Sequence, residues 1–100
     1  MLTTVQFGNV SPLMTKVLVS DPIDQAGIDI LSQVAEVDQC VGLTLDDLKQ
    51  IIGKYDGLMI RSGTQVTSDV IQAGEKLRII VRAGVAVDNV DVHAATKRGI

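Results

Sequence analysis

Aromatic residues, cysteine and net positive charge are all scarce in this sequence. Of its 100 residues, 2% are aromatic, and Cys40 is the single cysteine. One cysteine excludes an intrachain disulfide and a thiolate zinc cluster, and it fits a reducing compartment. Lysine and arginine number 9 against 12 acidic residues, so the net charge of −3 provides no overall basic field for nucleic acid or an anionic membrane. An anionic ligand would need cations placed locally.

Long apolar runs are also lacking. None approaches the ~18 residues of a membrane span, because arginine, glycine or aspartate interrupts each of them. Residues 1–15 carry no acid, but they also have no arginine and no long apolar core, so neither a transit nor a secretory signal is predicted. We expect a cytoplasmic protein in which residues 1–15 form a poorly ordered N-terminal extension.

Aliphatic residues dominate what the sequence does contain, as is typical of an α/β domain with a parallel sheet. Short apolar runs alternate with segments of helical periodicity. We expect strands at residues 16–20, 35–40, 58–61 and 77–81, and helices beginning near Asp24, Thr44, Thr67 and Asp91. This alternation predicts a flavodoxin-like parallel sheet of strand order 2-1-3-4, with right-handed crossovers and helices on both faces.

The spacing of apolar residues predicts which face of each helix is buried. In the first helix, residues three and four positions apart form one stripe: Ile23, Gly27, Ile30, Leu31 and Val34. The second begins with a capping box, and its expected inward side chains are Leu45, Leu48, Ile51 and Ile52. The third is expected to turn Val70, Ile71 and Gly74 inward.

The last two residues, Gly99 and Ile100, have the pattern of a helix end followed by a new strand. We therefore expect the sheet to be incomplete at its C-terminal edge and residues 16–100 to be part of a larger domain. No Gly-x-Gly-x-x-Gly dinucleotide fingerprint occurs in the sequence.

Two expected strand ends carry the most informative residues. One strand runs directly into Arg61, Ser62, Gly63 and Thr64, and the next runs into Arg82 and a glycine-containing turn. Parallel strands end at the same edge of a sheet, so the two arginines are expected to lie side by side. A guanidinium forks two hydrogen bonds onto a carboxylate or phosphate, and glycine lets backbone N–H groups approach the same anion. A small acidic ligand is predicted.

The residues around these strand ends resemble the D-isomer-specific 2-hydroxyacid dehydrogenases. The similarity covers residues 16–100 and is strongest in residues 55–67 and 82–92, continuing through residues 94–100. It implies that this chain forms most of a substrate-binding domain. It also implies that a Rossmann domain holding NAD, together with the catalytic histidine and glutamate, lies outside these residues. No catalytic, cofactor-binding or metal-binding residue is therefore expected in this chain.

The resemblance implies that Arg61, Ser62 and Thr64 face the phosphate and carboxylate of the substrate. A guanidinium and two hydroxyls are suitable donors for such an anion. The alternative for Arg61 is a surface ion pair with Asp56 or Asp69. The Ser-Gly-Thr run that follows the arginine favours the ligand role.

Arg82 resembles the second arginine of the substrate site, and the alternative is a structural ion pair with Asp88. Gly84 and Val85 resemble the turn whose backbone amides hold the substrate carboxylate. Two residues depart from the family pattern, because Val81 and Ala86 stand where glycines are usual, and either would crowd a backbone of positive φ.

Nearby polar residues have structural interpretations. Asp88, Asn89 and Asp91 are expected to cap the short last helix and to fasten the preceding loop. His93 is expected in the first turn of an exposed helix and is not assigned a catalytic role.

The implied activity is NAD-dependent oxidation of 3-phospho-D-glycerate to 3-phosphooxypyruvate, on the route to serine, by a homo-oligomer. This chain alone would be inactive. Alternatives are a dehydrogenase acting on glyoxylate or hydroxypyruvate, and a non-enzymatic binding or receiver module. A receiver module requires a phosphorylatable aspartate where the third strand ends, and Arg61 stands there instead.

Overall fold

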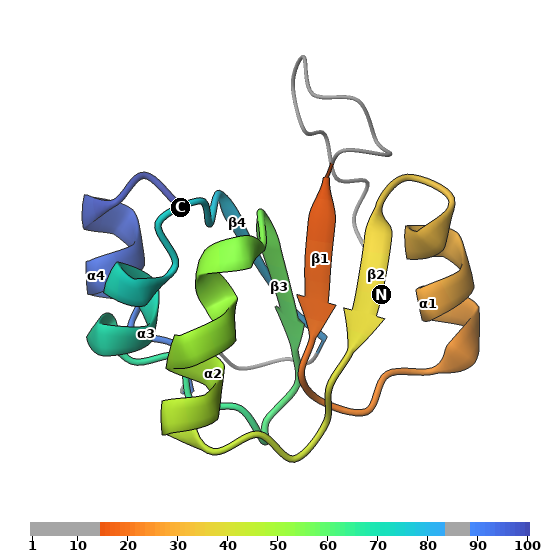
Figure 1. Ribbon diagram of the computed structural model, residues 1–100, viewed down its shortest axis with the longest axis horizontal. Helices are drawn as coiled ribbons and strands as arrows, with labels where there is room; N and C mark the ends of the chain where they lie inside the picture. Colours follow the sequence, from red (N-terminus) through yellow and green to blue (C-terminus); the bar gives the residue numbers. More distant parts are fainter. Residues whose placement is uncertain (1–14, 84–88) are drawn as a thin grey trace.

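A four-stranded parallel sheet forms the centre of the computed structural model, which describes residues 15–83 and 89–100 (Figure 1). Its strands are β1 (Lys16–Val19), β2 (Glu36–Gln39), β3 (Gly57–Ile60) and β4 (Ile79–Arg82). Their order is β2-β1-β3-β4 and all three pairings are parallel, which confirms the predicted topology and the edge position of β2. Since the strands are parallel, the C-terminal ends of β1, β3 and β4 lie along the same edge of the sheet, the one that runs across the strand ends.

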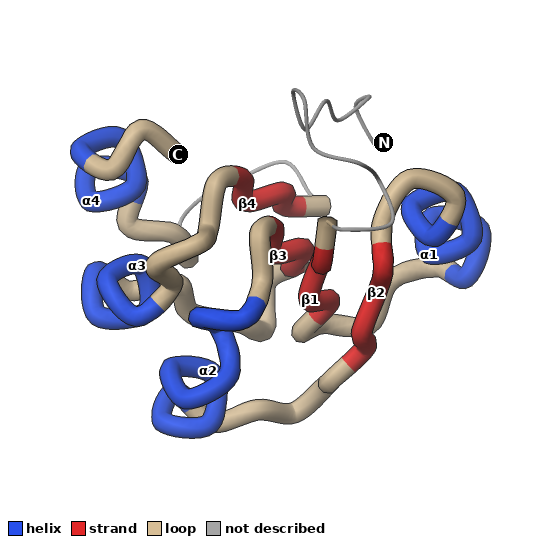
Figure 2. The backbone as a smooth tube through the Cα atoms, turned by 45° about the horizontal axis from the view of Figure 1, so that its top comes forward, coloured by secondary structure: helices blue, strands red, loops and turns tan. Residues whose placement is uncertain are grey.

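Helices cover both faces of this sheet. They are α1 (Gln25–Ser32), α2 (Leu45–Ile51) with the short 3-10 turn η2 (Ile52–Lys54), α3 (Ser68–Ala73) and α4 (Val92–Lys97). Figure 2 shows α1 on one side of the strands and α2, α3 and α4 on the other.

Three of the predicted helix starts have a side-chain cap. Thr44 accepts a hydrogen bond from the backbone N–H of Asp47, and Thr67 accepts one from the N–H of Val70. Asp91 caps α4 in the same way through the N–H of Ala94. Each cap satisfies a backbone donor that the first helical turn leaves without an intrahelical partner.

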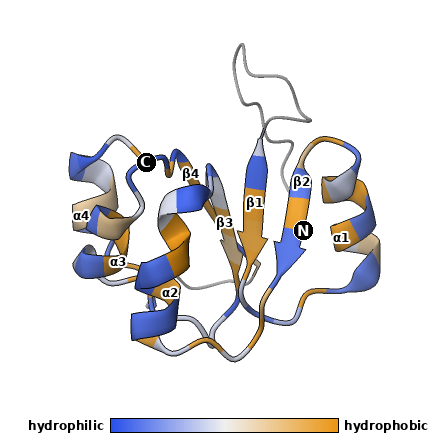
Figure 3. Ribbon diagram, in the orientation of Figure 1, coloured by the Kyte–Doolittle hydropathy of each residue, from blue (hydrophilic) through white to orange (hydrophobic). Residues whose placement is uncertain are grey.

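Alternate side chains of the strands supply two hydrophobic clusters. Leu18, Leu58 and Ile60 point toward α2 and α3, whereas Val17, Val19 and Met59 point toward α1. In Figure 3 the central strand β1 is mostly in the orange of apolar residues, whereas the edge strand β2 is mostly blue. Cys40 is half-buried and packs against the first cluster, in agreement with a structural thiol.

The predicted stripe of α1 is partly wrong. Ile28 and Leu31 are the buried residues of this helix, whereas Ile30 is 59% exposed and Val34 is 39% exposed. Ile28 and Leu31 are also three positions apart, so they define a helix face as regular as the predicted one. Spacing alone therefore does not decide which of the two faces is buried. In α2, Leu45 is also exposed, at the first position of the helix.

The last helix is fastened to α3 by an arginine. The Nη1 atom of Arg98 donates to the carbonyl oxygen of Ile71 at 2.6 Å, and Nη2 donates to that of Gly74 at 3.1 Å. These carbonyls belong to the C-terminal end of α3, where a cation is favourable. The chain then turns through Gly99, whose φ is 76°. Within the described residues no fifth strand pairs with β4.

At the other end of the chain, the predicted N-terminal extension lies outside the described residues except for Thr15. Thr15 is buried, and its carbonyl oxygen accepts a hydrogen bond from the N–H of Glu36 at 2.8 Å. In the part of the chain that the structure describes, no helix is long and apolar enough to cross a membrane.

A buried tyrosine links β2 to the loop before β3. The hydroxyl of Tyr55 donates to the carboxylate of Asp38 at 2.7 Å. Burial raises the pKa of Tyr55 above its ordinary value of 10.0, and the hydrogen bond to Asp38 raises it further. The folded state therefore favours the protonated phenol.

Replacing Tyr55 with phenylalanine should lower the free energy of unfolding by about 1 kcal/mol at neutral pH. The difference should shrink as pH rises above 10.0, because Tyr55 then ionises in the unfolded chain while the folded chain still holds the proton. Urea unfolding of both proteins across this pH range measures it. A difference that stays constant with pH would contradict the assignment.

Candidate functional site

The edge where β1, β3 and β4 end is organised by a buried carboxylate, that of Asp21. Its Oδ2 atom accepts hydrogen bonds from the backbone N–H groups of Arg61 at 2.7 Å and Thr64 at 2.9 Å. Its Oδ1 atom accepts from the hydroxyl of Thr64 at 2.8 Å. The side chain that follows β1 thus holds both ends of the loop that follows β3, residues 61–64. Three donors offset the cost of burying the charge.

The same carboxylate explains the glycine of this loop. A Cβ atom at Gly63 would lie 2.7 Å from Oδ1 of Asp21, which is closer than side-chain carbons and carboxylate oxygens approach one another. Because Asp21 is buried and fixed by its donors, it has little room to withdraw. Gly63 is therefore required by close packing.

The hydroxyl of Thr64 is already engaged. It donates its single proton to Asp21, and it accepts a hydrogen bond from the hydroxyl of Ser20, whose oxygen lies 2.7 Å away. The predicted role of Thr64 as a ligand donor therefore has competition inside the protein. The structure instead shows Thr64 fixing the loop.

Arg61 and Ser62 are exposed at this edge. Over residues 15–83 and 89–100, Arg61 forms no ion pair with Asp56 or Asp69, so the contact required by the alternative interpretation is not made. The carboxylate of Asp56 instead accepts from the backbone N–H of Lys16. Both Arg61 and Ser62 have side chains available to a ligand.

A second side chain, that of Asn89, holds the loop from the opposite side. Its Nδ2 group donates to the carbonyl oxygens of Arg61 at 2.6 Å and Thr64 at 2.7 Å, and its Oδ1 atom accepts from Nε of Arg82 at 2.6 Å. The prediction that Asn89 fastens this region is confirmed, and so is the capping role of Asp91.

The two arginines lie at the same end of the sheet. Arg82 pairs in register with Ile60, the residue before Arg61, so the arginines stand at the ends of neighbouring strands. Arg82 is half-buried and Arg61 is exposed. Two cations at one sheet edge can receive a ligand with two anionic groups.

The structure describes only some of the remaining residues that the sequence analysis singled out. Gly84 and Val85 lie outside the described residues, as do Ala86 and Asp88. Val81 fits its strand without strain, since no described residue other than glycine has a positive φ. His93 is exposed in α4, as expected.

Asp21 is the residue of this site that sequence reasoning missed. By its local pattern Asp21, followed by Pro22, is a turn residue that ends the first strand, and this pattern does not indicate a role in the site. A signal was present: an acidic side chain directly after a buried strand lies at the same edge as residues 61–64 in a parallel sheet. Its partners are 40 and 43 positions away, which local patterns do not reveal.

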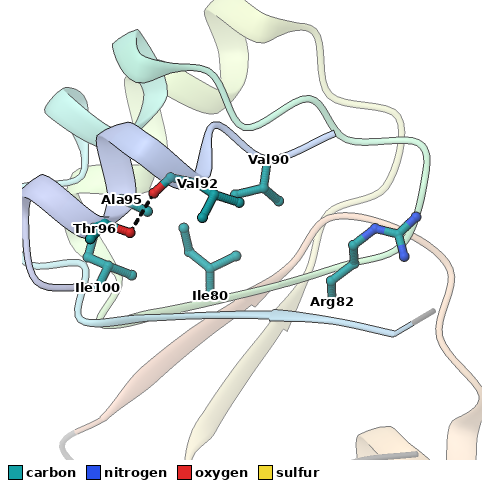
Figure 4. Close-up of a pocket in the computed structure, with 7 residues that line it drawn as sticks. All are labelled: Ile80, Arg82, Val90, Val92, Ala95, Thr96 and Ile100. Atoms are coloured by element: carbon teal, nitrogen blue, oxygen red, sulfur yellow. Dashed lines mark hydrogen bonds between the residues drawn. The ribbon is translucent and has the colours of Figure 1, made fainter. Parts of the chain in front are cut away.

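A pocket of about 260 Å³ lies beside this edge, between β4 and α4 (Figure 4). Apolar side chains form most of its wall, and the guanidinium of Arg82 points away from them. Its other polar side chain, Thr96, uses its hydroxyl to donate to the carbonyl oxygen of Val92 at 2.7 Å. The pocket offers an anionic ligand little beyond Arg82.

A dinucleotide does not fit the turn between β1 and α1. Such cofactors need a glycine-rich turn between the first strand and its helix, with backbone N–H groups facing the pyrophosphate. Here that turn contains Asp21 and Pro22, and Asp24 stands at the start of α1. A carboxylate would repel pyrophosphate, and proline has no N–H to donate. We therefore derive no cofactor chemistry from this turn.

Comparison with known proteins defines the class of this domain. The family described as D-isomer specific 2-hydroxyacid dehydrogenase, catalytic domain, matches residues 17–100. The chain belongs to this family.

Individual relatives agree with the family match. The chain is 60% identical over 87 residues to D-3-phosphoglycerate dehydrogenase of Synechocystis, covering 87% of this chain and 16% of that protein. It is 53% identical over 87 residues to the protein of that name from Methanocaldococcus jannaschii, with 87% and 17% covered. An NAD+-bound 3-phosphoglycerate dehydrogenase structure from Entamoeba histolytica has a TM-score of 0.77 at 31% identity, over 86% of this chain and 31% of that one.

Replacing Gly63 with alanine should lower the free energy of unfolding by about 1–3 kcal/mol, because the loop must move away from Asp21. Ser62→Ala, one position away and exposed, is the matched control and should change stability by less than about 0.5 kcal/mol. Chemical unfolding of both variants measures this. Equal stabilities would show that Asp21 does not restrict the loop.

Proposed function

We propose that this chain is the substrate-binding part of an NAD-dependent D-3-phosphoglycerate dehydrogenase. The whole protein would oxidise 3-phospho-D-glycerate to 3-phosphooxypyruvate, in the cytoplasm and on the route to L-serine, and would act as a homo-oligomer. NAD and the catalytic histidine and glutamate would be supplied by a Rossmann domain outside these residues. The chain by itself would be inactive.

One observation carries this proposal. Arg61 is exposed and forms no ion pair within the described residues, yet Asp21 and Asn89 fix the backbone on both sides of it. An exposed arginine on a rigid loop is preorganised for a ligand, because the backbone that carries it loses little conformational entropy on binding. Family membership and the names of the relatives support 3-phosphoglycerate as this ligand.

Different residues of the chain would bind different groups of the substrate. Arg61 and Ser62 would bind one anionic group, and Arg82 would hold another beside the backbone amides of Gly84 and Val85. Thr64 would support the loop, and its hydroxyl would reach the substrate only by exchanging its bond to Asp21. The role of this part is to bind and orient the substrate, with the redox chemistry elsewhere.

Replacing Arg61 with alanine in the full-length protein that contains this chain should raise KM for 3-phosphoglycerate. A charge-assisted contact to phosphate is worth about 1.5–3 kcal/mol, so kcat/KM should fall roughly ten- to hundredfold. Arg61→Lys should restore only part of the loss, because lysine returns the charge without the planar fork. Affinity for NAD and the melting temperature should stay near those of the parent protein.

The same measurements separate the alternatives. An Arg61 that only stabilises the fold would lower the melting temperature and leave KM nearly normal. Comparing 3-phosphoglycerate with glyoxylate and hydroxypyruvate as substrates tests specificity. A higher kcat/KM for either unphosphorylated acid would assign the protein to the other branch of the family.

A further inference from the structure

Asn89 connects the two strand ends through a single side chain. Its carboxamide contacts the backbone of Arg61 and the guanidinium of Arg82 at 2.6 Å each. It is 6% exposed, so water does not compete effectively for these bonds. We propose that Asn89 is a positioning residue that sets the relative placement of Arg61 and Arg82, and through them the affinity for the anionic substrate. This inference rests on the proposed function.

The orientation of the carboxamide follows from its partners. Nε of Arg82 can only donate, and the carbonyl oxygens of Arg61 and Thr64 can only accept. Oδ1 must therefore face Arg82 and Nδ2 must face the loop. Of the side chains of this length, only asparagine offers an acceptor and two donors together. Aspartate would turn an oxygen toward two carbonyl oxygens, and leucine would leave all three groups unsatisfied.

The backbone of Asn89 is itself anchored. Its carbonyl oxygen accepts from the N–H of Val66 at 2.8 Å, and the N–H of Asp91 donates to the carbonyl oxygen of Val66 at 2.9 Å. Val66 and Val90 form a parallel bridge between these segments. The backbone that carries the carboxamide is thus joined to Val66, two residues after the loop whose carbonyl oxygens the carboxamide binds.

The consequence is a coupling between the arginines. Nε is part of the planar guanidinium, so a bond to Nε fixes both the direction and the plane of the Arg82 group. The other end of the carboxamide fixes the backbone from which Arg61 projects. Loss of Asn89 would leave both charges in place and remove their common support, so substrate binding should weaken while the net charge is unchanged.

The test uses the full-length protein that contains this chain, with 3-phosphoglycerate as the probe. Asn89→Ala should raise KM by about tenfold, with kcat and NAD affinity within about twofold of the parent values. Asp91→Ala is the matched control. It removes a hydrogen bond two residues away that caps α4 and touches neither arginine, so it should lower the melting temperature and leave KM unchanged.

A double-mutant cycle tests the link to Arg82. Arg82→Lys keeps the charge but removes Nε, so adding Asn89→Ala to it should raise KM by a smaller factor than in the parent protein. Equal factors in the two backgrounds would overturn the link.

Further outcomes separate this inference from the proposed function. If Arg61→Ala raises KM and Asn89→Ala does not, positioning by Asn89 is wrong and the proposed function stands. If neither variant changes KM, the proposed substrate site itself is wrong. Should Asn89→Ala fail to fold, Asn89→Leu, which is similar in size and uncharged, replaces it with the same expected rise in KM.

Discussion

The hydrogen bonds that Asp21 accepts are the interaction on which the candidate site depends. They join the end of β1 to both ends of the loop after β3 and place a buried negative charge beneath it. A carboxylate there opposes an anionic ligand electrostatically, since like charges repel over short distances in a protein. Asp21 instead fixes the loop, because it accepts three hydrogen bonds from the loop residues. Its close approach to the loop also requires Gly63.

Asn89 completes this arrangement from the other side. Asp21 binds the N–H groups of Arg61 and Thr64, and Asn89 binds their carbonyl oxygens. The loop therefore has little freedom left before any ligand arrives. A rigid loop loses less conformational entropy on binding, which favours affinity for a small anion. The sheet provides the framework, because parallel pairing brings the ends of β1, β3 and β4 together.

Sequence patterns predicted the fold well because the elements are short, regular and alternating. They failed where two choices were locally equivalent: α1 could bury Ile28 or Ile30, and only the position of the sheet decides between them. The arginines of the site were predictable because each follows an apolar strand. The hydrogen bonds of Thr64 and Asp21 were not, because they join residues 43 positions apart. Asn89 was correctly expected to fasten its region, but its partners could be found only in three dimensions.

The central claim is that the edge formed by Arg61 and Arg82 binds the substrate. The most direct measurement is a crystal structure of the full-length protein with 3-phosphoglycerate bound. We expect the phosphate and carboxylate within hydrogen-bond distance of these two guanidinium groups, with residues 61–64 in the same conformation as without ligand. A substrate bound elsewhere, or one that touches neither arginine, would contradict the account.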